Sequence, residues 1–341
     1  MSYVERVEKM LQRFVIIFCI IILSSVFSLA QTAHTTSSKK KITIGMIGKM
    51  ANNPVFLASY SGARSAAIEL GTKYNIDIVI DWQTPAVENV EEQAAAIDRF
   101  SRSKVDGIAI ACSDANYLTQ TINNTVDKGI PIICFDSDAP KSKRFAYYGA
   151  DDISFGRMLM LELAKEINEN GTIAVLVGNK NALNLQRRLQ GIMEELKKYP
   201  RISLSQENIF HNLDIPERAS DKIQKEQKAN PSIKGWILIT STALQVNNSL
   251  KWKPGEVKVV AGNAVPVELE YVKSGYVQSL AGINCFQIGY KSIELLIEKV
   301  IKNKTPYNPL MYSPITAVNK NNVDEWSLNW KKWILKESLD R

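Results

Sequence analysis

The sequence predicts an α/β protein of two Rossmann-like lobes in tandem, each with a parallel sheet covered by helices. Short apolar runs rich in β-branched residues alternate with amphipathic stretches from Lys41 onward. The apolar runs lack a polar face, as expected for strands that are covered on both sides. The same order of elements restarts after Asp151, and 341 residues suffice for about two domains of roughly 150 residues each.

The first predicted lobe repeats a unit of one strand followed by one helix. Its strand-like segments are rich in Ile, and its helix-like segments place apolar residues three and four positions apart. We expect strands at residues 42–47, 76–81, 107–111, 130–135 and 145–148, and helices at residues 55–71, 87–102 and 116–128. The crossover between neighbouring parallel strands should be right-handed.

The second predicted lobe begins with a helix and follows the same pattern. We expect a helix at residues 153–169, a strand at 172–177, a helix at 184–198, a weak strand near 202, a helix at 216–229, strands at 236–240, 257–261 and 277–281, and a helix at 286–302. After Asn319 the chain is mostly polar and carries Trp326, Trp330 and Trp333 at spacings of four and three. Their spacing favours one face of a terminal helix docked on the body over a partner-binding surface.

The N-terminus has the pattern of an export signal. Basic residues precede an apolar run from Phe14 to Leu23, and the small residues before Gln31 resemble a cleavage site. Residues 1–30 are therefore predicted to be a signal peptide, and residues 31–40 a disordered leader. An uncleaved anchor is the less favoured alternative, because residues 14–30 are at the short limit for a membrane span. We expect a periplasmic or other extracytoplasmic location.

Composition and motifs argue against several functions. The formal net charge is +7, but Lys and Arg are interleaved with Asp and Glu, so we expect no nucleic-acid partner. The chain has two histidines, His34 and His211, and lacks the motifs of serine hydrolases, zinc proteases and phosphate-binding loops. We therefore expect neither an enzyme nor a bound metal or cofactor.

Three cysteines follow the predicted signal peptide. Cys112 and Cys134 come near the ends of consecutive predicted strands, so a disulfide between them is conceivable in an oxidising compartment. Buried free thiols are the favoured interpretation for both residues and for Cys285.

Polar side chains gather where the predicted strands end, and open α/β sheets bind ligands at that edge. The group combines carboxylates and amides with one guanidinium and aromatic rings, which suits a small polyhydroxylated ligand. The candidate contacts are Asn53, Phe56, Trp82, Asp114, Asp136, Asp138, Asn184, Arg188, Asp214, Thr240 and Asn263. The alternative is that strand ends are polar because loops are polar. Asp136 and Asp138 lie too close in sequence to flank a glycosidic bond easily, which favours binding over hydrolysis.

A series of segments matches one known family in order and spacing. They include ITIGMI at residues 42–47, NNPVF at 52–56, GIPIICFDSDAP at 129–140, VVAGN at 259–263 and KSGYVQ at 273–278. Together they resemble the type I periplasmic sugar-binding proteins, the ribose- and galactose-binding group, over about residues 41–325. The resemblance implies that Asn53, Phe56 and Asp136 contact a sugar from the first lobe. It implies that Arg188 and Asn263 contact the sugar from the second lobe.

The resemblance also implies how the lobes are built and used. The N-terminal lobe would comprise residues 41–150 and 284–312, the C-terminal lobe residues 151–283 and 313–325, and a terminal helix or tail residues 326–341. Three chain crossings would form a hinge, near residues 149–152, 281–284 and 312–314. We expect a monomer that closes on its carbohydrate ligand and is recognised by the membrane permease of an ABC transporter. The alternative is a sensory module, for a sugar or an autoinducer-2-like ligand, that presents its closed form to a chemoreceptor or sensor kinase.

Overall fold

The computed structural model describes residues 39–211 and 215–338, together with residues 3, 7 and 10. The predicted signal peptide, nearly all of the predicted leader and Asp214 therefore lie outside the described residues. Contacts divide the chain into residues 1–40 and residues 41–341, and the second unit holds both sheets. Within the described ranges, no helix combines the length and apolar character needed to cross a membrane.

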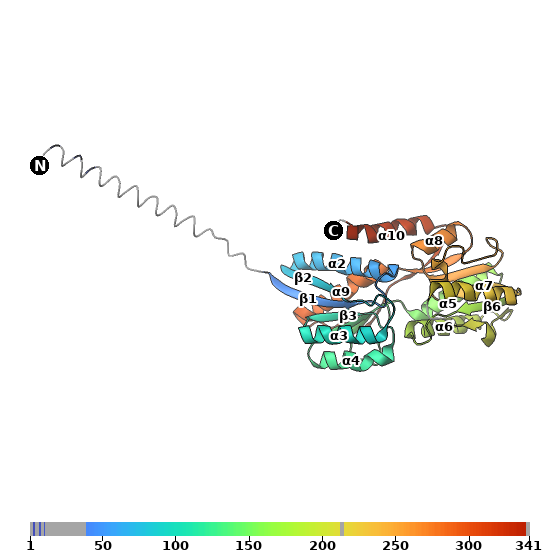
Figure 1. Cartoon of the computed structure of the whole chain (residues 1–341), viewed down its shortest axis with the longest axis horizontal. Coiled ribbons are helices and arrows are strands. Elements are labelled where there is room, and N and C mark those ends of the chain that lie inside the picture. The colour runs from blue at the N-terminus through green and yellow to red at the C-terminus, as the bar shows by residue number, and fades with distance from the viewer. Residues whose placement is uncertain (1–2, 4–6, 8–9, 11–38, 212–214, 339–341) are drawn as a thin grey trace. The chain divides into compact units, whose positions relative to one another are not determined.

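The first sheet has the strand order β12-β5-β4-β3-β1-β2. Its strands are β1 (Lys40–Ile47), β2 (Ile76–Trp82), β3 (Gly107–Ile110), β4 (Ile132–Phe135), β5 (Ala146–Gly149) and β12 (Leu310–Tyr312). Its helices are α2 (Pro54–Tyr74), α3 (Val90–Ser103), α4 (Ala115–Asp127) and α9 (Cys285–Lys302). Helices α2 and α9 pack together, as do α3 and α4 (Figure 1). We call this sheet with its four helices the first lobe.

The second sheet has the order β13-β11-β10-β9-β6-β7, with β8 also paired to β6. Its strands are β6 (Gly171–Leu176), β7 (Ile202–Ser203), β8 (Ile209–Phe210), β9 (Ile233–Leu238), β10 (Lys258–Asn263), β11 (Ser279–Ile283) and β13 (Ile315–Asn319). Its helices are α5 (Asp152–Glu166), α6 (Leu183–Leu196), α7 (Pro216–Ala229), α8 (Pro266–Lys273) and α10 (Val323–Ser338). Strand β13 runs antiparallel to β11, whereas the other described pairings are parallel. This sheet and its helices form the second lobe.

The predicted fold class is confirmed: each lobe is a parallel-dominated sheet with helices packed against it. Every helix predicted from the sequence is present within a few residues of its expected bounds. The prediction missed α8, which is eight residues long and begins with a proline. It also missed β8, β12 and β13, which are two to five residues long and give little periodic signal.

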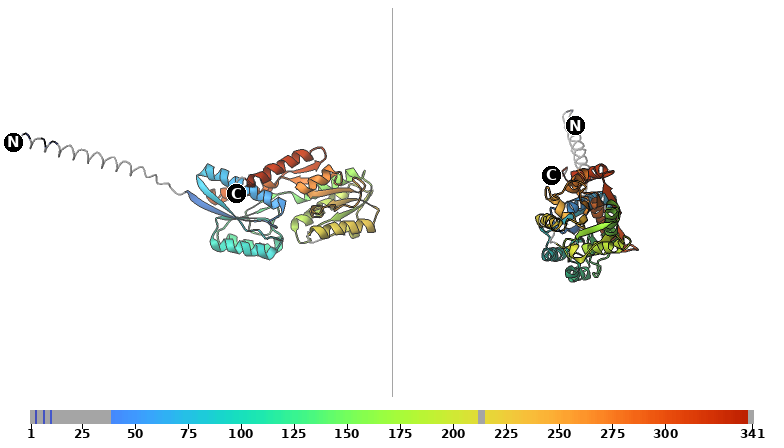
Figure 2. Two further views of the ribbon diagram at one scale, coloured as in Figure 1. Left: turned by 45° about the horizontal axis from the view of Figure 1, so that its top comes forward. Right: turned by 90° about the vertical axis from the view of Figure 1, so that its right-hand side faces the viewer.

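The chain passes between the two sheets three times. It leaves the first sheet after β5, returns between β11 and α9, and leaves again between β12 and β13. Figure 2 shows the two lobes, with the blue and teal elements in the first and the yellow-green elements in the second. All three connections are short, so few backbone dihedrals separate one lobe from the other.

Two other expectations about side chains are confirmed. Cys112, Cys134 and Cys285 are free and buried. The sulfur atoms of Cys112 and Cys134 are 3.9 Å apart, far beyond the bond length of about 2.05 Å in a disulfide. Trp330 and Trp333 are buried on α10 with their rings 5.0 Å apart, so the tryptophan face of this helix docks on the body.

Candidate functional site

A cavity of about 140 Å³ lies where strand ends of both sheets meet. It is lined by Lys49, Met50, Asn53, Val55, Phe56, Glu88, Asp136, Ala182, Asn184, Leu185, Arg188, Pro216, Thr240, Ser241, Thr242, Gln245, Asn263 and Val265. Seven of the eleven candidate contacts are in this lining: Asn53, Phe56, Asp136, Asn184, Arg188, Thr240 and Asn263.

The start of α2 brings an amide and an aromatic ring to the cavity. Asn53 is the N-cap of α2, and its Oδ1 accepts a hydrogen bond from the backbone N–H of Val55 at 3.0 Å. The proline that follows it suits the first turn of a helix, because no backbone donor is lost there. Phe56 lies edge-on to Phe135, with 6.4 Å between ring centroids. The Asn53 amide nitrogen and the Phe56 ring are thereby held at the cavity by backbone and core contacts.

Asp136 supplies a buried carboxylate at the end of β4. Its backbone has a φ of +57°, and its carbonyl oxygen accepts a hydrogen bond from the Tyr147 hydroxyl at 3.0 Å. A left-handed aspartate is uncommon and marks a position held by its surroundings. Burial raises the pKa of the Asp136 carboxyl, and the positive charges of Lys49 and Arg188 oppose that rise. The carboxylate therefore needs hydrogen-bond donors in place of the water that burial removes.

Arg188 supplies the facing guanidinium from α6. Its Nε donates to Asp152 Oδ1 at 3.0 Å, and its guanidinium carbon lies 3.8 Å from the ring centroid of Phe155. Its Nη1 is 3.5 Å from Asn263 Oδ1. Burial raises the pKa of Asp152 to about 6, although Arg188 lowers it. The ion pair and the ring orient the guanidinium so that its remaining N–H groups face the cavity lining.

Two hydrogen bonds join the lobes at this cavity. Asn184, at the start of α6, accepts hydrogen bonds at Oδ1 from Lys49 Nζ at 3.3 Å and from Ser137 Oγ at 3.4 Å. Lys49 and Ser137 belong to loops of the first lobe, whereas Asn184 belongs to the second. In the second lobe, the Thr240 hydroxyl pairs with that of Thr242 at 3.2 Å.

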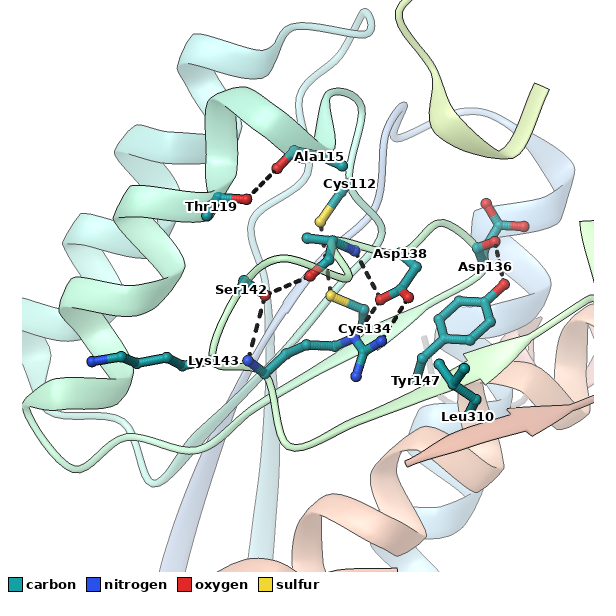
Figure 3. A network of polar contacts seen from close by, with 12 residues as sticks. Cys112, Ala115, Thr119, Cys134, Asp136, Asp138, Ser142, Lys143, Tyr147 and Leu310 are labelled. Carbon is teal, nitrogen blue, oxygen red and sulfur yellow. Dashed lines mark hydrogen bonds and ion pairs between the residues drawn. The ribbon is translucent and has the colours of Figure 1, made fainter. Parts of the chain in front are cut away.

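Three predicted contacts are placed outside this lining. The Trp82 ring packs on Tyr60, with 5.0 Å between centroids. Asp114 caps α4 by accepting from the backbone N–H groups of two residues, and it lines a neighbouring groove instead. Asp138 is buried, and its carboxylate binds Arg144 and its own loop (Figure 3). A strand-end position therefore does not by itself aim a side chain into the cavity. The fourth, Asp214, lies outside the described residues.

Sequence reasoning missed two charged residues of the lining, Lys49 and Glu88. Lys49 is 8% exposed and forms no ion pair with any described residue. Glu88 Oε1 is buried and, within the described part of the chain, has no hydrogen-bond partner. Both lie in loops whose course the periodicity does not predict. The only sequence signal was the position of Lys49 shortly after β1.

The lining can hold a neutral, polyhydroxylated molecule. Its two cations, Lys49 and Arg188, are balanced by the carboxylates of Glu88 and Asp136. Carboxylates and amide oxygens accept from hydroxyl groups, and ammonium, guanidinium and amide nitrogens donate to them. Residues 39–211 and 215–338 contain no group of three or more His, Cys, Asp or Glu side chains placed to hold a metal ion.

The chain is similar to several known proteins. A family model described as a periplasmic binding protein domain matches residues 44–304. The ribose import binding protein of Escherichia coli (strain K12) is 22% identical over 285 residues, which cover 83% of this chain and 92% of that protein. The ribose import binding protein of Bacillus subtilis (strain 168) is 23% identical over 156 residues. That match covers 46% of this chain and spans about half, 49%, of the relative.

One solved structure resembles this chain over both lobes. It is an ABC transporter solute binding protein from Burkholderia graminis C4D1M in complex with D-arabinose. It superposes with a TM-score of 0.76 at 25% identity, and the match covers 83% of this chain and 97% of that one.

Proposed function

Since the chain belongs to the family of periplasmic binding protein domains, we propose that it captures a small neutral sugar or polyol outside the cytoplasm. The loaded protein then delivers this ligand to the membrane permease of an ABC transporter and does not transform it. Two relatives are named as ribose import binding proteins, and the Burkholderia graminis structure was solved with D-arabinose. These names support a pentose as the first ligand to test.

The observation that carries the proposal is that Asp136 and Arg188, which come from different lobes, line the same cavity. Asp136 follows β4 of the first lobe, and Arg188 lies on α6 of the second. A hydroxyl-bearing ring between them donates to the carboxylate and accepts from the guanidinium, so binding favours the arrangement in which both lobes contact the ligand. Ligand binding thus shifts the population toward the closed form.

A melting screen tests this function. Pentoses, hexoses, inositols and autoinducer-2 are added to the exported chain, and the melting temperature is compared with that of the ligand-free protein. A ligand at 100 times its dissociation constant adds about 2.7 kcal/mol of stability. We expect Asp136→Asn to lose this shift, because an amide replaces one acceptor oxygen with a donor.

Asp127→Asn is the matched control, since Asp127 is exposed on α4 and pairs with Lys143 away from the cavity. It should keep the full melting shift. The proposal fails if no sugar or polyol raises the melting temperature of the unmodified protein. A loaded protein that binds a sensor but supports no ATP-dependent uptake would instead point to a sensory role.

A further inference from the structure

Helix α10 brings two indole N–H groups to one backbone carbonyl beside the cavity. Trp326 Nε1 and Trp330 Nε1 donate to the carbonyl oxygen of Ala264 at 2.9 and 2.7 Å. A carbonyl oxygen has two lone pairs, so the two bonds use its acceptor capacity fully. Ala264 follows Asn263 directly, and the side chain of Asn263 lines the cavity. The C-terminal helix is therefore bonded to the loop that carries a candidate ligand contact.

This loop, residues 263–265, has a backbone that L-amino acids rarely adopt. The φ angles are +81° at Asn263 and +53° at Ala264. Consecutive left-handed residues other than glycine are unfavourable and persist only where surrounding contacts hold them. The contacts here are the two indole donors and the bond from the Val265 backbone N–H to Glu268 Oε2 at 3.0 Å.

The strained backbone determines where the Asn263 amide lies. Asn263 Oδ1 is 3.5 Å from Arg188 Nη1, and its Nδ2 is 3.4 Å from Ser241 Oγ. Relaxation of φ to the ordinary negative region would turn the amide away from Arg188. The same carbonyl that anchors α10 thus controls a polar group of the cavity.

Helix α10 also contacts parts of the molecule that belong to different lobes. It packs against α8 and β13 of the second lobe and against α2 of the first (Figure 1). The Trp326 ring covers Gly282 in β11, where an added Cβ would lie 2.6 Å from ring atom Cζ2. Gly282 comes just before the crossing into α9. Helix α10 therefore contacts the loop 263–265, the end of β11 before the crossing into α9, and elements of both lobes.

We propose that Trp326 and Trp330 are positioning residues of the binding site, which hold Ala264 and thereby aim the Asn263 amide at the ligand. The inference rests on the proposed function for its consequence, which is ligand affinity. The structural part of the inference is that the two tryptophans hold the loop 263–265, and this part does not depend on any ligand.

The test replaces both indoles in one variant, Trp326→Phe with Trp330→Phe, which keeps the rings and removes the N–H donors. Trp333→Phe is the matched control. The Trp333 ring packs on both other tryptophans, but its indole N–H forms no hydrogen bond among the described residues. Amide hydrogen exchange in the ligand-free protein should be about tenfold faster at Val265 in the double variant and unchanged in the control. The dissociation constant for D-ribose or D-arabinose, measured by calorimetry, should rise about tenfold in the double variant alone.

A third variant separates positioning from general loss of stability. Ala264→Gly removes the side chain that makes a positive φ unfavourable. Added to the double variant, Ala264→Gly should lower the dissociation constant at least threefold. A variant that had lost affinity only through general destabilisation would not regain it. If the double variant does not fold, each single Trp→Phe variant keeps one donor and should show a smaller change of the same sign.

Equal exchange at Val265 in all variants overturns the inference. So does an equal loss of affinity in Trp333→Phe. If the unmodified protein binds no sugar, the proposed function fails, whereas the exchange measurement still decides whether the tryptophans hold the loop.

Discussion

Glu268 is a fully buried carboxyl on α8, next to the loop that carries Asn263. Its Oε2 accepts the Val265 backbone N–H, and within the described chain its Oε1 has no partner. Burial raises the pKa of Glu268 to about 8 from an ordinary value of 4.5. The folded protein therefore binds this proton more tightly than the unfolded chain does. The contribution of Glu268 to the stability of the fold is largest below pH 4.5 and is lost as the pH rises toward 8.

Glu268→Gln should remove this pH dependence, because the amide does not titrate. Between pH 6.5 and 8 the free energy of unfolding of the unmodified protein should fall by roughly 1.5 kcal/mol, whereas that of the variant should not show this fall. This window lies above the pKa of about 6 of Asp152, whose own titration follows the same sign at lower pH. The measurement is the free energy of unfolding in urea at both pH values.

Glu270→Gln is the control, since Glu270 lies on the same helix with 70% of its side chain exposed. It should keep the pH dependence of the unmodified protein. Parallel curves for Glu268→Gln and the unmodified protein would show that Glu268 does not titrate in this range.

Each lobe contains a pair of helices that approach until their backbones touch. In the first lobe, a Cβ added to Gly62 of α2 would lie 1.9 Å from the Phe286 carbonyl oxygen of α9. In the second, a Cβ on Gly156 of α5 would lie 1.9 Å from the Arg188 carbonyl oxygen of α6. Backbone cannot move aside as a flexible side chain does, so both positions exclude any larger residue.

Gly156→Ala and Gly62→Ala should therefore have one effect in common and one that differs. Both should destabilise the fold by about 1–3 kcal/mol, because the clash outweighs the better helix propensity of alanine. Only Gly156→Ala displaces the backbone of Arg188, so only it should weaken sugar binding strongly. Calorimetry at a temperature where both variants are folded makes the comparison. Equal affinities in the two variants would mean that the α5–α6 contact does not position Arg188.

The elements that the sequence predicted well are those with a strong local pattern. Helix α7 was predicted with its observed bounds, since Pro216 begins it and polar residues follow Ala229. The short helix α8 and the strands β12 and β13 were missed because they are held by neighbours in space. Strand β13, for example, pairs antiparallel with β11, although α9 and β12 lie between the two strands in the sequence.

The sequence indicated part of the cavity lining but not all of it. Strand ends indicated the region of Asp136, Arg188 and Asn263, which line one cavity, because parallel strands end at one edge. The direction of each side chain depends on loop geometry that periodicity does not encode. Asp136 and Asp138 lie two residues apart, yet one lines the cavity and the other pairs with Arg144. Lys49 reaches the cavity from a loop, and its position shortly after β1 was the only sequence signal for it.

Two hydrogen bonds between described residues join the lobes beside the cavity. Lys49 and Ser137 of the first lobe both donate to one acceptor atom, Asn184 Oδ1 of the second. Lys49 is buried and has no ion pair among the described residues, so loss of this acceptor leaves an ammonium group poorly solvated. An open arrangement would return it to water.

Asn184→Ala should therefore shift the ligand-free protein toward open forms, which small-angle scattering detects as a larger radius of gyration. Saturating sugar should bring the variant back to the radius of the loaded unmodified protein, because ligand hydroxyl groups supply new acceptors to Lys49 and Arg188. The shift is a change in population, so its size depends on how much this contact favours the closed state over the open one. Gln190→Ala is the control, since Gln190 is exposed on the same helix and pairs with Glu194. Identical scattering from the ligand-free variant and the unmodified protein would show that other contacts hold the lobes together.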